Sequence, residues 1–270
     1  ASYRGPTCPY LISPSFLGLS IVVVLLFWSE STPKQLAKGG KQEGMDKKSR
    51  RSIRDALGLI FTTPRILALG VAQSCFESAM HIWVLFWAPT MSTTVQASFG
   101  GSATTCYGTV FSCFMVACML GSTLFGLTTK KVRLERIGTI VYTIASLCLA
   151  FASYYLQCEK PTTTTTVLKL LASYLGFETV VGMYFPLIGT LRGSILPDTH
   201  RSILMTLFAV PLNVIIVTVY LSLDRLGYAG AMQVAAVLLG LGACGMGYLD
   251  YSSIRPHAPQ IRSAKPILCN

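Results

Sequence analysis

The sequence predicts an all-α, polytopic membrane protein. Hydrophobic residues make up 52% of the 270 residues, and charged residues make up only 12%. Soluble domains are about one-quarter charged, so this composition is typical of a chain that lies mostly in lipid. Several apolar runs also approach or reach the ~20 residues that a helix needs to cross a bilayer.

Seven apolar runs are expected to form transmembrane helices. The first is short and ends in the aromatic pair Phe27-Trp28, which is typical of the membrane–water interface. The second is expected to end at Pro89, because proline interrupts helical hydrogen bonding. The seven runs cover about residues 13–28, 66–90, 107–128, 137–157, 168–192, 202–223 and 228–248.

Charge alternates between the loops that join these runs. Residues 29–65 hold nine Lys/Arg and four Asp/Glu, and the loop around residues 129–136 holds four Lys/Arg and one Glu. The loop between them, residues 91–106, has no charged residue. Because basic loops are retained on the cytosolic side, we expect residues 29–65 and the C-terminus to be cytosolic. We expect the membrane to be the plasma membrane.

Four segments follow from this layout. Residues 1–28 hold the last helix of a truncated N-terminal half, and residues 29–65 form a basic linker with an amphipathic helix near residues 49–60. Residues 66–250 form a six-helix C-terminal bundle, and residues 251–270 form a tail. Many secondary transporters pair two six-helix bundles, so we expect a missing N-terminal half to be a partner of this chain.

The net charge of +11 raises the question of nucleic acid, but the basic residues lie in loops, where membrane topology explains them. Nine cysteines are scattered without a C-x-x-C spacing. We therefore expect no metal site, no cofactor and no nucleic-acid partner. The histidines His81, His200 and His257 lie far apart, and no hydrolase or metalloprotease motif occurs. The sequence thus predicts no catalytic residues and argues against a membrane enzyme.

A polar stripe runs along the apolar segment of residues 66–90. Gln73, Glu77 and His81 are spaced four residues apart, so they share one face of a helix. Ionisable residues within the membrane are costly and usually mark a substrate or proton path, here with His81 and Glu77 exchanging protons. The alternative is a structural role in interhelical hydrogen bonds.

The segment of residues 168–192 contains a second intramembrane acid, Glu178. Tyr174 and Gly182 flank it at a spacing of four residues, and further glycines and a proline lie nearby. Such helices face protein or a water-filled cavity, so this segment is expected to line a transport path. Close helix packing is the alternative reading of the glycines. In the next segment, Asn213 and Thr206 lie on one side, and the Asn213 amide could bind an oxyanion or cap a neighbouring helix.

Four stretches together resemble the molybdate-anion transporter family of the major facilitator superfamily. The match covers about residues 13–250, and its elements occur in the family's order. They are FESAMHIWVLFWAP at residues 76–89, GTVFSCFMVACMLGS at residues 108–122, ETVVGMYFPLIGTLR at residues 178–192, and VPLN at residues 210–213.

The resemblance implies a secondary transporter that imports molybdate by alternating access. It further implies that the segments of residues 66–90 and 168–192 line the central path. Lys130 and Lys131 resemble part of the superfamily's gating loop, although the acidic residue usual in that loop is missing here. The resemblance implies a cytosolic gate formed by Lys130, Lys131 and Arg192. A second departure is Ala209, where the family pattern has an arginine.

Charge leaves the transported solute open. A dianion such as molybdate is expected to bind to Arg, Lys or helix N-termini. The predicted transmembrane segments instead contain two intramembrane carboxylates, Glu77 and Glu178. Either the missing half supplies cations, or the carboxylates take up protons during symport. A proton-coupled carrier of a neutral or cationic solute fits the residues equally well. A membrane scaffold or receptor that does not transport is a third alternative.

Overall fold

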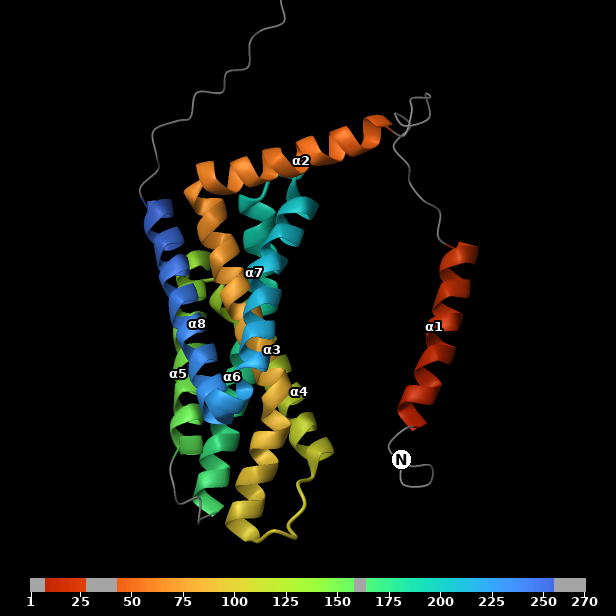
Figure 1. Cartoon of the computed structure of the whole chain (residues 1–270). Coiled ribbons are helices and arrows are strands. Elements are labelled where there is room, and N and C mark those ends of the chain that lie inside the picture. The colour runs from red at the N-terminus through yellow and green to blue at the C-terminus, as the bar shows by residue number, and fades with distance from the viewer. Residues whose placement is uncertain (1–7, 28–42, 158–163, 255–270) are drawn as a thin grey trace, which may run out of the picture. The chain divides into compact units, whose positions relative to one another are not determined.

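The computed structural model describes residues 8–27, 43–157 and 164–254, and every regular element in these ranges is a helix (Figure 1). The chain divides into two compact units, residues 1–49 and residues 50–270. The prediction of an all-α polytopic membrane protein is confirmed. The boundary between the units falls within the segment predicted to be the linker.

The first unit contains α1 (Cys8–Phe27). Residues 14–27 of α1 include no charged residue, and hydrophobic residues lie on all sides of the helix. A helix that is apolar all round is typical of a membrane span. Its described side chains, Pro14–Phe27, form an apolar helix that is shorter than the candidate membrane spans of the second unit.

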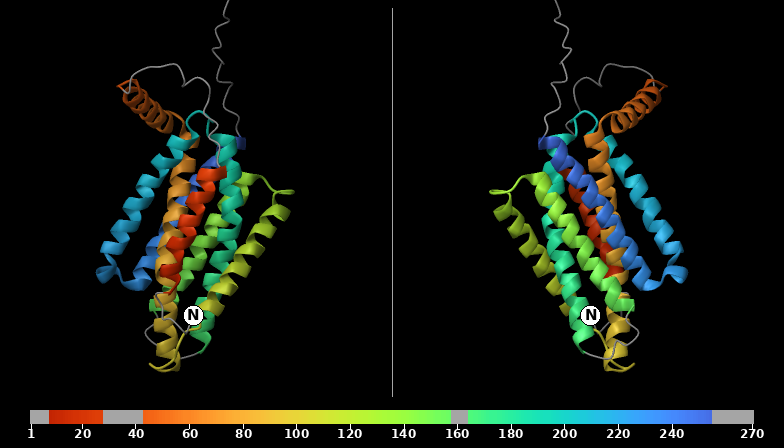
Figure 2. Two further views of the ribbon diagram at one scale, coloured as in Figure 1. Left: turned by 90° about the vertical axis from the view of Figure 1, so that its right-hand side faces the viewer. Right: turned by 90° about the vertical axis from the view of Figure 1, so that its left-hand side faces the viewer.

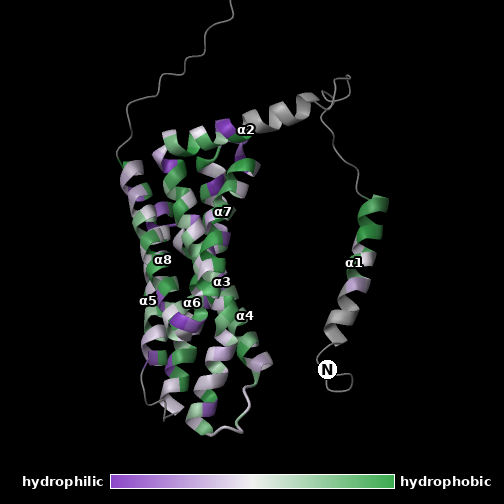
Figure 3. Ribbon diagram, viewed as in Figure 1, coloured by the Kyte–Doolittle hydropathy of each residue, from purple (hydrophilic) through white to green (hydrophobic). Residues whose placement is uncertain are grey.

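Five helices of the second unit are long and apolar enough to cross a membrane. They are α4 (Tyr107–Thr128), α5 (Leu134–Gln157), α6 (Thr164–Ile195), α7 (Arg201–Leu221) and α8 (Leu223–Ile254). Figure 3 shows hydrophobic residues along most of their length. A sixth span results if α3 (Pro64–Phe99) is counted together with residues 53–62 of α2 (Glu43–Thr62), which bend away from it by 100°.

The second unit is a bundle in which α6 packs against α3, α4 and α5, and α8 packs against α3 and α5. Figure 2 shows α4 and α7 on opposite sides of this bundle. These two helices bury the smallest share of their apolar residues, and each packs mainly against one neighbour, α6 for α4 and α3 for α7. The helices α3 and α6 are therefore central, as expected for path-lining segments.

Two differences from the predicted helix limits have a clear local cause. The helix α3 continues past Pro89 to Phe99, where the sequence predicted an end. Prolines are tolerated within membrane helices, where neighbouring groups satisfy the freed backbone, and Thr90 and Thr94 donate hydrogen bonds to carbonyls one turn back. In α8, Gly227 breaks the helix with a φ of 63°, a left-handed conformation that favours glycine. The predicted start at residue 228 lies directly after this break.

Glycines set the distance between α4 and α6. A Cβ atom on Gly121 would clash with the Thr179 carbonyl oxygen, and one on Gly182 would clash with the Cys118 carbonyl oxygen. The two backbones therefore touch at this crossing, which is the close approach that small residues permit in membrane helices. Of the glycines near Glu178, Gly182 thus serves helix packing.

Candidate functional site

An ion pair joins the two central helices. Arg192, in the last turn of α6, donates from Nη2 to Oε1 of Glu77 on α3 at 2.7 Å. The Arg192 side chain is 19% exposed and that of Glu77 is 23% exposed. The pair is thus mostly withdrawn from the surface, yet a small solute can still reach it.

Two further side chains complete this cluster. Nε of Arg192 donates to Oε1 of Gln73 at 2.9 Å, and the Tyr184 hydroxyl donates to Oε1 of Glu77 at 3.1 Å. Gln73 is only 4% exposed, and Tyr184 is fully buried. We call Gln73, Glu77, Tyr184 and Arg192 the arginine cluster. It brings two predicted path residues together with a residue that was predicted for the cytosolic gate.

Aromatic rings fix one side of the arginine cluster. The Tyr184 ring stacks on Phe76 at a centroid distance of 3.8 Å, and Tyr142 meets Phe76 edge-on at 5.0 Å. The Tyr142 hydroxyl is buried and has no hydrogen-bond partner among the described residues. These rings restrict the rotamers of the cluster, because densely packed side chains cannot move independently.

The cluster has the chemistry of a site for small oxyanions. A guanidinium carries five N–H donors in a planar fork, which suits oxyanions such as phosphate. The hydrogen bonds described above use Nε and Nη2 of Arg192, so donors on Nη1 remain. Glu77 supplies the opposite charge in the absence of such an anion, and an anion would compete with it for Arg192.

The second predicted carboxylate, Glu178, lies elsewhere on α6. It is 5% exposed and forms no hydrogen bond or ion pair with the described residues. Its neighbour Thr179 lies at the glycine crossing with α4. The structure therefore does not include Glu178 in the arginine cluster.

Tyr174 lies further toward the start of α6. Its hydroxyl is 2.7 Å from Oγ1 of Thr90 on α3, and both residues are buried. Its ring meets Trp83 edge-on at 5.8 Å. This contact joins α3 and α6 a second time, within an apolar and aromatic environment.

Three other predicted path residues bond within their own helices. Nδ1 of His81 is 2.6 Å from the Glu77 backbone carbonyl oxygen, and the ring is exposed. Asn213 donates from Nδ2 to the Ala209 carbonyl at 2.8 Å, and Thr206 donates to the Ser202 carbonyl at 3.1 Å. In this conformation His81 contacts only the Glu77 backbone, and none of the three hydrogen-bonds to a side chain of the arginine cluster.

Lys130 and Lys131 are exposed in the turn between α4 and α5. Close to them in sequence, Arg133 and Arg136 approach the Asp250 carboxylate of α8 at 3.8 Å and 3.6 Å, and Arg133 also donates to the Ser253 hydroxyl. These contacts tie the start of α5 to the end of α8. Arg192, the third residue predicted for the gate, turns inward to Glu77 instead.

No three side chains among His, Cys, Asp and Glu gather in a metal-binding arrangement within the described residues. Six cysteines of the bundle are free, namely Cys75, Cys106, Cys113, Cys118, Cys148 and Cys244. The chemistry of the site described here therefore rests on the arginine cluster.

Comparison with known proteins agrees with this architecture. A major-facilitator family described as sugar transporters with 12 transmembrane helices matches residues 3–177. The chain belongs to this family. Its members are transporters rather than enzymes, and the match spans α1 and the first half of the six-helix bundle.

Curated relatives share the architecture at lower identity. A molybdate-anion transporter of Takifugu rubripes is 28% identical over 226 residues, 79% of this chain and 45% of that protein. Molybdate-anion transporters of Xenopus tropicalis and Danio rerio are 28% and 27% identical, each over 78% of this chain and over 42% and 44% of their own length. The chain thus spans less than half the length of these relatives. No solved structure matches the chain.

Sequence reasoning missed two features of the arginine cluster. It assigned Arg192 to the helix end, and it did not single out Tyr184. The sequence contains one signal for both, because Tyr184 and Arg192 are eight residues apart and so lie near the same face of α6. This face of α6 meets Gln73 and Glu77 only if α6 is shifted along its axis relative to α3. The sequence does not specify that shift.

Proposed function

We propose that this chain forms the C-terminal bundle of a secondary transporter that imports a small oxyanion, molybdate in the first instance, by alternating access. The observation that carries the proposal is the ion pair between Arg192 and Glu77 on the two central helices. The chain's relatives named molybdate-anion transporter support the choice of anion. An N-terminal half would supply the other side of the path.

The arginine cluster also offers a way to couple the anion to a proton. While Glu77 is ionised, it occupies Arg192 and repels a dianion. A proton on Glu77 removes both effects, so that proton and anion would bind together and move in the same direction. Glu178 is the second proton site of this proposal, because it is buried without a cationic partner among the described residues.

A second candidate is a proton-coupled carrier of a neutral or cationic solute. Glu178 favours it, since a buried carboxylate with no cation beside it does not help to bind an anion. The family description, which names sugar transporters, agrees with a neutral solute. In this case Arg192 would serve only to hold Glu77 in place.

Uptake into membrane vesicles that contain the protein separates these candidates. We expect molybdate to enter faster with an inward proton gradient, sulfate to compete, and Arg192→Gln to abolish uptake. Uptake of a sugar but not of molybdate, with Arg192→Gln still active, would replace the anion proposal by the second candidate. If neither solute enters the vesicles under any gradient, the alternative of a membrane scaffold that does not transport remains.

We also propose that the end of the bundle that carries Lys130, Lys131 and Arg133 faces the cytosol of a plasma-membrane protein. The basic residues Arg65, Arg133 and Arg136 share this end through ion pairs with Glu135 and Asp250. A membrane-impermeant maleimide should label Lys131→Cys more than the parent chain only after the cells are permeabilised. Extra labelling in intact cells would reverse the orientation.

A further inference from the structure

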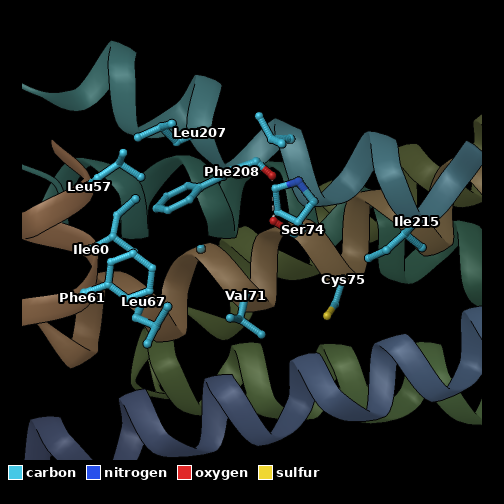
Figure 4. Close-up of a pocket in the computed structure, with 13 residues that line it drawn as sticks. Leu57, Ile60, Phe61, Leu67, Val71, Ser74, Cys75, Leu207, Phe208 and Ile215 are labelled. Carbon is cyan, nitrogen blue, oxygen red and sulfur yellow. Dashed lines mark hydrogen bonds between the residues drawn. The ribbon is translucent and has the colours of Figure 1, made fainter. Parts of the chain in front are cut away.

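An apolar cavity of about 430 Å³ lies between residues 57–61 of α2, the start of α3 and the middle of α7 (Figure 4). Its volume falls in the range of small-molecule sites, about 300–1,000 Å³. The one polar side chain that lines it is Ser74, whose hydroxyl already donates to the Phe208 carbonyl at 2.8 Å. The cavity therefore offers its occupant only apolar contacts.

The cavity results from how three helices meet. The bend of 100° after residue 62 carries Leu57 and Phe61 past the side of α3. The Phe208 ring of α7 packs where Gly70 has no Cβ atom, since a Cβ there would clash with the ring. The rim is open and apolar, with Phe61, Val71 and Val210 at 76%, 43% and 56% exposure. In a membrane protein such a rim faces acyl chains.

Basic residues adjoin the apolar lining. Along α2, Arg54 precedes Leu57 and Phe61 by three and seven residues, so these positions lie on one helix face. The helix continues toward its start with further lysines and arginines. An amphipathic helix with a basic portion lies in the membrane interface and attracts anionic headgroups.

We propose that this cavity binds an acyl chain of an anionic phospholipid whose phosphate is recognised by Arg54 of α2. The apolar lining explains the acyl chain, and Arg54 explains the preference for negative charge. Arg54 lies about 4.5 Å along the helix from Leu57, at ~1.5 Å per residue, so a headgroup at the rim is within its reach. Such a lipid would join α7, which packs mainly against one helix, to α2 and α3.

The test measures lipids retained by the purified chain in native mass spectrometry, with dioleoyl-phosphatidylglycerol against dioleoyl-phosphatidylcholine. Val71→Trp fills the cavity, and Leu147→Trp on the exposed face of α5 is its control. Arg54→Gln removes the basic residue beside the lining. Its control, Lys130→Gln, removes an exposed one elsewhere.

We expect phosphatidylglycerol to be retained at one saturable site and to bind about tenfold more weakly in the two cavity-side variants, with both controls unchanged. Should Val71→Trp not fold, as judged by helical content, Leu57→Gln tests the same wall from α2. Equal retention of phosphatidylcholine would overturn the anionic preference. Unchanged phosphatidylglycerol binding in Val71→Trp or Leu57→Gln would overturn the site, and would indicate that another chain segment or detergent occupies it.

Discussion

Two intramembrane carboxylates of this bundle have opposite environments. Glu77 accepts hydrogen bonds from Arg192 and Tyr184 at 2.7 Å and 3.1 Å. Glu178 is buried and forms no hydrogen bond with the described residues. A charge within the membrane needs a partner or a proton, and Glu77 has a cation beside it, whereas Glu178 has none among the described residues.

The surroundings of the two carboxylates differ as well. Around Glu77 the contact between α3 and α6 is made by polar side chains, which can exchange partners. Near Glu178 the contact between α4 and α6 is made by backbone against backbone at Gly121 and Gly182. The comparison indicates that the region around Glu77 can respond to a bound anion by exchanging side-chain partners, which the backbone contact near Glu178 does not offer.

The largest effect is expected where backbones touch. Gly182→Val should destabilise the bundle by about 3 kcal/mol or more, because the added side chain would force α4 and α6 apart. Thermal unfolding in detergent measures this change. Gly189→Ala is the matched control, since a Cβ at Gly189 meets open space. Equal unfolding temperatures for the two variants would show that the close crossing is not required.

The next largest effect is expected at the ion pair. Arg192→Gln should cost about 1–3 kcal/mol, because it leaves the mostly withdrawn Glu77 without its cation. The double variant Arg192→Gln/Glu77→Gln should recover part of that loss, since no charge is then left unpaired. A double-mutant cycle from chemical or thermal unfolding measures the coupling energy. Additive losses would mean that the two side chains do not interact in the folded protein.

A smaller effect is expected from one hydroxyl. Tyr184→Phe should cost about 1 kcal/mol, because Glu77 loses one donor while the ring still stacks on Phe76. The loss should vanish in a Glu77→Ala background, where the hydroxyl has no carboxylate to contact. A loss that persists there would mean that the hydroxyl stabilises the fold through a contact other than Glu77.

The smallest effect on stability is expected at Glu178. Glu178→Gln should change the free energy of unfolding by less than about 1 kcal/mol, since glutamine has nearly the same shape and the change breaks no hydrogen bond with the described residues. Its effect should instead appear in transport, where proton-driven uptake is lost and solute exchange persists. Unchanged proton-driven uptake would make Glu178 a packing residue.

Most of the fold could be predicted from the sequence, because lipid imposes length and composition on each helix. The helix α4 covers the residues that its apolar run predicted, Tyr107–Thr128. The end of α3 could not be predicted in this way. Residues 91–99 are uncharged and contain many polar side chains, so their sequence resembles a loop. In the structure they continue the helix, and threonine hydroxyls bond to its carbonyls.

The site was less accessible to sequence reasoning. The spacing of Gln73 and Glu77 placed both on one face, and the structure shows both in hydrogen-bond contact with Arg192. The partner itself could not be predicted, because it depends on how far α3 and α6 are staggered. The Asn213 amide shows the reverse case, a polar group within an apolar run that bonds to its own helix at Ala209.

Molybdate binding by the purified chain, compared between the parent and two variants, tests most directly whether an anion and Glu77 compete for Arg192. We expect Glu77→Gln to bind more tightly than the parent, because it leaves the guanidinium free for the anion. Arg192→Gln should not bind. Parent-like binding by Arg192→Gln would contradict the account.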